Sequence, residues 1–231
     1  MKASLSLGIQ LLALFLFFAA AMFPGLTLSE VSVDFERFHR LMHDNFGNDR
    51  TDLSRDWEEM LNEIADLPDD EKIQRVSRFF HRNLGQDSDM NIWGVEDYWA
   101  TPLETLGMGE GDCNDWAIAK YFSLRIAGID ENNLRLIYTT AEIRSGWSTR
   151  TEPHMVLGYY PEPGAEPQIL DNIERRVRPA SRRTDLRPVF SFNSEGMWQG
   201  AAGASTGGSS TASLSSWRDL LERTRDEGIS W

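Results

Sequence analysis

The sequence that decides the fold of this chain surrounds its single cysteine and reads Gly111-Asp112-Cys113-Asn114-Asp115-Trp116-Ala117-Ile118-Ala119-Lys120-Tyr121. Acidic residues followed by an apolar run are typical of the start of a helix. We expect this helix to run from about residue 114 to residue 127, with Gly128 as its stop signal. Because a helix start favours negative charge, the thiol is predicted to lose its proton more easily than an ordinary cysteine.

The hydrophobic pattern differs on the two sides of this motif. Before it, the spacing of apolar residues predicts helices over residues 33–43, 54–65 and 69–84. Residues 86–111 keep no period and predict a long ordered loop rich in aromatic side chains. After the motif, alternation predicts strands over residues 134–143, 154–160 and 168–173. Helices first and strands later predict an α+β domain with an antiparallel sheet.

The 231 residues divide into three parts. Residues 1–28 contain a long apolar stretch followed by small residues, which predicts a signal peptide or an uncleaved N-terminal anchor. Residues 29–199 form one domain, and residues 200–231 combine a flexible Gly/Ala/Ser linker with a short helix. We therefore expect an exported domain that faces an extracytoplasmic space.

Charge narrows the classes of partner. The net charge is −13, and a protein of this sign is repelled by phosphate backbones, so nucleic acid is not an expected partner. One basic cluster interrupts the acidic surface. We interpret it as solvated arginines that pair with the acidic excess, with a docking patch for an acidic peptide as the alternative. It comprises Arg175, Arg176, Arg178, Arg182, Arg183 and Arg187.

A lone cysteine cannot form an internal disulfide, so Cys113 is either a small buried hydrophobe or a working thiol. A working thiol needs a base, and the chain has four histidines. His39 and His43 lack the glutamate of a zinc-protease motif and are interpreted as surface residues. His81 is interpreted as structural, in a helix. His154 begins a strand after a polar loop, which is a common place for a catalytic base.

The base in turn needs a group that orients it. Asp171 ends the apolar run 168–170 and needs a polar partner there. If the connection between the second and third strands turns at Gly164, Leu157 faces Asp171 and His154 lies about three residues away along the strand. His154 and Asp171 are therefore candidate neighbours. The alternative is that Asp171 merely starts a turn with Asn172.

Five blocks, which follow one another along the chain in the order that the family has, resemble the bacterial transglutaminase-like cysteine proteinases of the LapG type. They are residues 111–122, residues 93–94 with 97–104, residues 154–157, residues 170–172 and residues 188–193, and the resemblance covers roughly residues 79–198. It implies a papain-like or transglutaminase-like core in which the nucleophile helix packs on the antiparallel sheet. It also implies that Cys113 attacks a peptide carbonyl, that His154 is the base, and that Asp171 orients it.

The family resemblance implies a biological setting as well. Such enzymes are periplasmic thiol proteases that cut a large repeat adhesin near its N-terminal end, after a pair of alanines, and so release it from the cell surface and promote biofilm dispersal. An inner-membrane receptor for cyclic di-GMP inhibits them when that signal is high. Members bind calcium through residues that match Asp112, Asn114 and Asp115 here. Because Asn114 stands where the usual member has glutamate, we expect calcium dependence with weaker affinity.

Three alternatives stay open at this point. The same thiol, histidine and aspartate serve acyl transfer to amines in transglutaminases, and the triad alone does not separate transfer from hydrolysis. A periplasmic binding protein could use the fold without catalysis. A cell-wall peptidase shares the nucleophile logic but not the aromatic block between Trp93 and Pro102. For calcium, the alternative is that acidic residues simply favour a helix start without any metal.

Overall fold

The computed structural model describes residues 31–146, 148–201, 203 and 215–230. The helical half of the chain comes first. Its elements are α1 (Phe35–Phe46), α2 (Asn48–Ile64), α3 (Asp69–Asn83), α4 (Asp89–Trp93), α5 (Pro102–Met108) and α6 (Cys113–Ile126), with the short strands β2 (Gly85–Gln86) and β3 (Glu110–Gly111) paired between them. The predicted α+β class is confirmed.

The second half forms a six-stranded antiparallel sheet in the order β7-β6-β5-β4-β8-β9. The strands are β4 (Leu134–Ser145), β5 (Ser148–Tyr159), β6 (Gln168–Leu170), β7 (Arg178–Pro179), β8 (Leu186–Phe192) and β9 (Met197–Gln199). A single turn of 3-10 helix, Glu131–Asn133, precedes β4, and another, Ala180–Arg182, lies between β7 and β8. The central hairpin β4–β5 is longer than its apolar alternation predicts, because its outer residues 148–151 are exposed.

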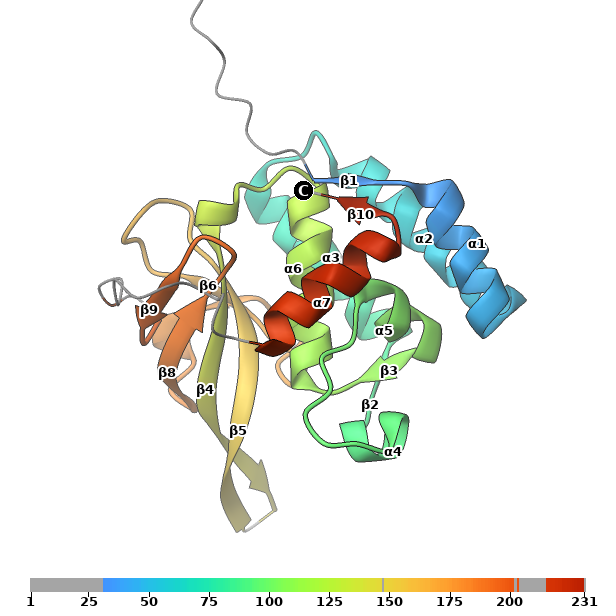
Figure 1. Ribbon diagram of the computed structural model, residues 1–231. Helices are drawn as coiled ribbons and strands as arrows, with labels where there is room; N and C mark the ends of the chain where they lie inside the picture. Colours follow the sequence, from blue (N-terminus) through green and yellow to red (C-terminus); the bar gives the residue numbers. More distant parts are fainter. Residues whose placement is uncertain (1–30, 147, 202, 204–214, 231) are drawn as a thin grey trace, which may run out of the picture.

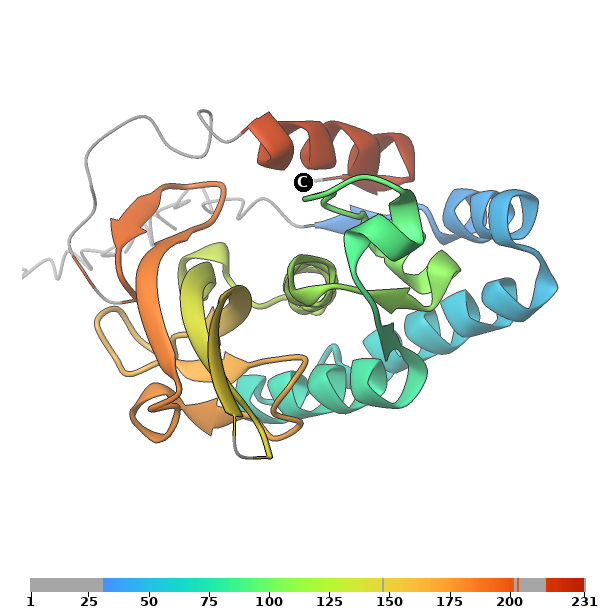
Figure 2. The same cartoon turned by 90° about the horizontal axis from the view of Figure 1, so that it is seen from below.

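Helix α6 occupies the centre of the molecule. Figure 1 shows the sheet on one side of it and α1, α2, α3 and α5 on the other, and in Figure 2 the same helix is seen end-on between the two layers. Eleven of its residues are buried, from Asn114 to Leu124, which explains why it shows almost no amphipathic stripe. Its polar residues inside the core, Asp115, Lys120 and Ser123, are fully buried. Such residues need partners, and two of them lead to the site below.

The first and last described segments of the chain pair with each other. Strand β1 (Ser32–Val33) pairs with β10 (Ile229–Ser230), and helix α7 (Ser215–Asp226) lies across the molecule with Trp217 and Leu220 fully buried. The helix predicted near the C-terminus therefore contributes to the core, beside α6 (Figure 1). Most of the predicted linker, residues 202 and 204–214, lies outside the described residues, as does the predicted signal segment, residues 1–28. None of the described helices is long and apolar enough to cross a membrane.

Two helices lie where the sequence predicted a loop. Helix α5 begins with a capping box in which Thr101 accepts from the Glu104 N–H and Glu104 accepts from the Thr101 N–H. Helix α4 has only five residues. Neither is long enough to establish an amphipathic period, and local capping rather than hydrophobic spacing defines the start of α5.

Candidate active site

Cys113 is the first residue of α6, and local hydrogen bonds fix its position. The N-cap Asp112 accepts from the backbone N–H groups of Asn114 and Asp115 through Oδ1, at 2.7 and 3.2 Å. In return, the Asp112 N–H donates to Asp115 Oδ2 at 3.3 Å. This capping box starts the helix one residue earlier than predicted and puts the thiol at its N-terminus.

The thiol lies against strand β5 of the sheet. Helix α6 packs on this strand, and the backbone N–H of Met155, the residue after His154, interacts with the Cys113 sulfur and favours its ionised form. The thiol also donates to Asn114 Oδ1, with a sulfur–oxygen distance of 3.9 Å. No hydrogen bond among the described residues joins Cys113 directly to His154. Catalytic contacts of this kind commonly tighten only when substrate is bound.

The thiol is less acidic than its helix position predicts. Burial, followed by the carboxylate charge of Asp112, raises the pKa of Cys113 to about 12, and the Met155 N–H opposes these effects only in part. Loss of solvation therefore outweighs the favourable end of the helix dipole. A lower pKa for the Cys113 thiol requires that the negative charge of the neighbouring Asp112 carboxylate be compensated.

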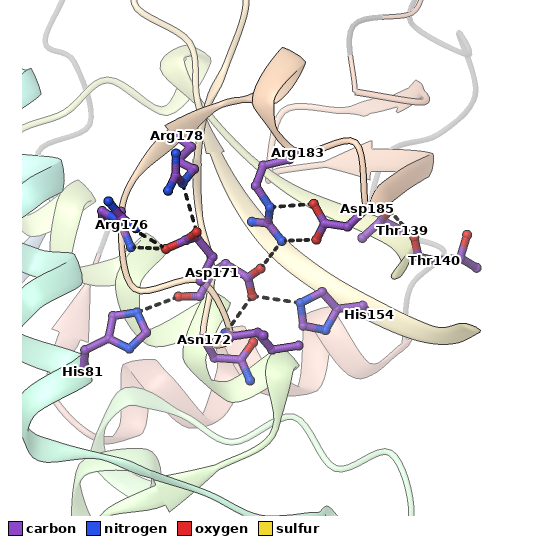
Figure 3. Close-up of polar contacts among 12 residues, drawn as sticks. His81, Thr139, Thr140, His154, Asp171, Asn172, Arg176, Arg178, Arg183 and Asp185 are labelled. Atoms are coloured by element: carbon purple, nitrogen blue, oxygen red, sulfur yellow. Dashed lines mark hydrogen bonds and ion pairs between the residues drawn. The ribbon is translucent and has the colours of Figure 1, made fainter. Parts of the chain in front are cut away.

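His154 is the first buried residue of β5, after the exposed or half-exposed residues 148–153. Its Nε2 lies 2.8 Å from Asp171 Oδ1, and both side chains are almost completely buried (Figure 3). Because Nε2 is engaged by the carboxylate, Nδ1 is the ring nitrogen left for a thiol. The register differs by one residue from the expected one, since Leu157 pairs with Leu170. Asp171, just beyond β6, nevertheless reaches His154.

Asp171 is held by a residue that the sequence analysis placed in the basic cluster. The Nη2 atom of Arg183 donates to Asp171 Oδ2 at 2.6 Å, and the same guanidinium binds Asp185 with two hydrogen bonds (Figure 3). Burial by itself raises the pKa of Asp171. The hydrogen bond from His154 and the charges of His154 and Arg183 outweigh it and hold this pKa well below its usual range. Asp171 is therefore an ionised partner for His154.

The other predicted histidines lie elsewhere. His39 bridges α1 and α2 through Ser54 and Glu58, at 2.7 Å from each, and His43 is exposed beside Asp44. His81 donates from Nε2 to the backbone oxygen of Asp171 at 2.9 Å, a structural role beside the site.

Three carboxylates converge on the other side of Cys113. Asp112 and Asp115, both predicted calcium ligands, are joined by Asp89 at the start of α4, and one oxygen of each lies within 4.8 Å of the others. Asp115 is fully buried, and its Oδ1 accepts from the Ala100 N–H at 2.8 Å. Asn114, the third predicted ligand, follows Cys113 and directs its Oδ1 towards the thiol. Asp89 was not predicted as a ligand, because it lies in the segment whose sequence has no hydrophobic period.

These carboxylates repel one another without compensation. Burial, and then the charge of Asp112, raises the pKa of Asp89 to about 6 and that of Asp115 well above its usual range. Burial also raises the pKa of Asp112. The Oδ1 atom of Asp89 is buried without a hydrogen-bond partner among the described residues. Hard oxygen ligands with an unsatisfied buried oxygen among them suit a cation such as Ca²⁺.

Comparisons with known proteins found a matching family and similar solved structures. The model of the family described as bacterial transglutaminase-like cysteine proteinase BTLCP matches residues 43–198. A structure of Legionella pneumophila LapG is 34% identical, with a TM-score of 0.68, and the match covers 82% of this chain and 97% of that one.

Two further structures of Legionella pneumophila LapG match over the same share of this chain. An EGTA-treated structure is 32% identical, with a TM-score of 0.69 and 97% of its chain covered. A calcium-bound structure is 34% identical, with a TM-score of 0.67 and 98% of its chain covered. The curated proteins contain no match.

Proposed function

The chain belongs to the bacterial transglutaminase-like cysteine proteinases, and we propose that Cys113, His154 and Asp171 are its catalytic triad. The observation that carries this proposal is the 2.8 Å hydrogen bond between His154 Nε2 and Asp171 Oδ1, on the strand against which Cys113 packs. Asp171 holds the imidazole with Nε2 towards itself. Nδ1 is then free to act on the thiol.

The proposed reaction is hydrolysis of a peptide bond in two steps. His154 removes the thiol proton, the sulfur attacks the peptide carbonyl, and the imidazolium returns the proton to the departing amine as the C–N bond breaks. Water then attacks the thioester with His154 again as base, which releases the acid product and the thiol. We expect the Cys113 N–H, at the start of α6, to donate to the oxyanion formed in each step.

We propose that Asp89, Asp112 and Asp115 hold a calcium ion, with the Asn114 side chain as a further predicted ligand. A calcium-bound structure of the related LapG supports the type of metal. A bound cation would offset the carboxylate charge that opposes ionisation of the neighbouring thiol. This gives a physical reason for calcium-dependent activity, because Asp112 is the neighbour whose charge most raises the pKa of Cys113.

The proposed biological role follows from the family. We infer a periplasmic enzyme that cleaves the N-terminal region of a large surface adhesin near a pair of alanines and thereby releases it and promotes biofilm dispersal. An inner-membrane cyclic di-GMP receptor is the proposed inhibitory partner. The net charge of −13 agrees with the absence of nucleic acid from this role.

Incubation with the N-terminal segment of a large repeat adhesin encoded beside this chain tests the proposal. We expect cleavage in calcium, none in EGTA, recovery when calcium is restored, and none with Cys113→Ala. Cleavage by Cys113→Ala would refute the assignment of the nucleophile. Full cleavage in EGTA would refute the metal assignment. Incorporation of a labelled amine into a glutamine-donor peptide, without hydrolysis, would indicate a transglutaminase instead.

A further inference from the structure

Asp171 is held at both of its ends. Its carboxylate binds His154 and Arg183, as described above. Its backbone carbonyl oxygen accepts two more hydrogen bonds, from Lys120 Nζ at 2.7 Å and from His81 Nε2 at 2.9 Å. The bond from His81 is visible in Figure 3, on the side of Asp171 away from His154. A carbonyl oxygen has two lone pairs, so both donors can be accommodated.

Lys120 belongs to the helix that carries the nucleophile. It lies seven residues after Cys113 in α6, which is about two helical turns, so the two side chains leave the same side of the helix. The Lys120 side chain is completely buried, with its nitrogen 4.9 Å from the centre of the Trp116 ring. Burying an amine is costly unless it is hydrogen-bonded. The bond to Asp171 supplies that compensation.

His81 approaches the same oxygen from α3. Burial, and then the charge of Lys120, lowers the pKa of His81 to about 4, so its ring is neutral near pH 7. A neutral ring that donates from Nε2 has its proton fixed on that nitrogen. The ring also lies against Trp116, with centroids 4.9 Å apart. Donors from two helices therefore converge on one backbone oxygen.

The backbone at Asp171 lies just beyond the sheet, in a turn where the Asn172 carbonyl accepts from the Gln86 side chain and the Ile173 N–H donates to Asp171 Oδ1 at 3.1 Å. Strand β6 has only three residues and ends at Leu170, so the sheet ladder stops one residue before the carboxylate that orients His154. The β5–β6 pairing does not extend to Asp171. The bond from Lys120 links it instead to α6, the element that positions Cys113. This bond therefore connects the orienting acid directly to the helix that carries the nucleophile.

We propose that Lys120, assisted by His81, is a positioning residue of the active site: it anchors the backbone of Asp171 to the nucleophile helix so that the Asp171 carboxylate orients His154. This inference rests on the proposed triad. Lys120 touches neither the thiol nor the imidazole in this role. Its effect on catalysis passes through Asp171.

The test compares Lys120→Met with Lys72→Met. Methionine keeps much of the lysine volume and removes the donor, and the Asp171 carbonyl oxygen keeps its second donor, His81, so that it is not left unsatisfied. Lys72 is a matched control, because it is also buried but lies in α3 with Asp69 as its partner, at 3.7 Å. Each variant is assayed for thermal unfolding, for kcat and KM on the adhesin segment, and for the rate of Cys113 alkylation by iodoacetamide between pH 5 and pH 10.

We expect Lys120→Met to lower kcat by about 10- to 100-fold with little change in KM, as small misplacements of catalytic groups do. Its alkylation profile should shift in the same direction as that of Asp171→Asn, because alkylation reports the thiol and its base without any substrate. Lys72→Met should keep the wild-type profile and kcat. A folded Lys120→Met with wild-type kcat and alkylation would overturn the proposal.

A double-mutant cycle separates positioning from general destabilisation. If Lys120 acts through Asp171, adding Lys120→Met to Asp171→Asn should cost little further activity. Full additivity would refute the proposal even if each single variant is impaired. Should Lys120→Met fail to fold, His81→Ala carries the same cycle, since His81 is only partly buried and donates to the same oxygen. A wild-type alkylation profile in Asp171→Asn would instead refute the triad itself.

Discussion

Two sets of carboxylates lie near Cys113, namely Asp171 alone and the trio of Asp89, Asp112 and Asp115, and the protein balances them in opposite ways. On one side, Asp171 receives hydrogen bonds from His154 and Arg183, and its pKa is held well below the usual range. On the other side, Asp89, Asp112 and Asp115 face one another, and the pKa of each is raised. The first set is paired with protein groups alone, whereas the second would be completed by the calcium ion proposed above. The effects of mutation and of calcium removal should therefore differ between the two sides.

The largest expected effect comes from substitution of Asp171. Asp171→Asn keeps the size of the side chain but removes the charge and the preference for one imidazole tautomer, and we expect kcat to fall by about 10²- to 10⁴-fold with KM nearly unchanged. Steady-state cleavage of the adhesin segment measures both constants. Asp185→Asn is the matched control, because Asp185 binds the same Arg183 guanidinium without contacting His154. An equal loss of kcat in both variants would contradict an orienting role for Asp171.

Replacing Arg183 should leave the Asp171 carboxylate partly uncompensated, as the carboxylates of the three aspartates are. Arg183→Met leaves a buried carboxylate without its guanidinium, and breaking a buried pair in this way destabilises by about 3–5 kcal/mol. Arg187→Met is the control, because Arg187 pairs with Glu142 at an exposed position, where ion pairs contribute about 0–1 kcal/mol. Urea unfolding at pH 7 measures both.

The pH dependence of the Arg183 effect has a definite sign. The folded-state pKa of Asp171 is depressed, so its contribution to stability is present above the ordinary aspartate pKa of about 3.9 and is lost as the pH falls through the folded value. The stability difference between wild type and Arg183→Met should therefore shrink only below about pH 4. A difference that disappears already at pH 6 would point to another partner for Arg183.

The sequence predicted the elements whose signals are local. The cysteine helix was expected at residues 114–127 and is observed at Cys113–Ile126, because its acidic start and its glycine stop are adjacent to it. Helix α3 likewise begins at Asp69, directly after Pro68, as predicted. Cys113, His154 and Asp171 were selected from their positions at the start of a helix and the ends of strands. No such signal marked the pairing of β4 with β8.

The partners of the site depend on contacts that sequence spacing does not encode. Arg183 looked like a solvated arginine among six, yet it is buried against Asp171. Asp89 lies in an aperiodic segment and reaches Asp112 only because α4 folds back towards the start of α6. Even the hairpin register was displaced by one residue, because the turn between β5 and β6 is not symmetric about Gly164. Tertiary packing decides which charges are compensated.

Substitution in the trio Asp89, Asp112 and Asp115 should have two opposite effects, a weaker affinity for calcium and a greater stability without it. We expect Asp89→Asn to weaken calcium binding at least about tenfold, since affinity depends on the charge of the ligands. In EGTA the same variant should be more stable than wild type, because it removes one of three mutually repelling buried charges. Calcium titration followed by thermal unfolding measures both effects. Glu96→Gln, an exposed neighbour, is the control, and an Asp89→Asn protein that loses stability in EGTA would contradict the repulsion.

The smallest expected effect comes from Glu227, a half-buried carboxylate outside both sets. Burial is the largest cause that raises its pKa, to about 8, and its Oε2 has no hydrogen-bond partner among the described residues. A folded-state pKa above the ordinary value of about 4.3 means that the folded protein binds the extra proton between these values, so stability falls as the pH rises through them. We therefore expect Glu227→Gln to be more stable than wild type between pH 5 and pH 9, which is measured as a higher unfolding temperature. Because Glu227 contacts Thr101 rather than the three aspartates, this gain should be the same in calcium and in EGTA. A gain that depends on calcium would mean that the metal site extends to the C-terminal segment, and the contrast between the two sides of Cys113 would then have to include it.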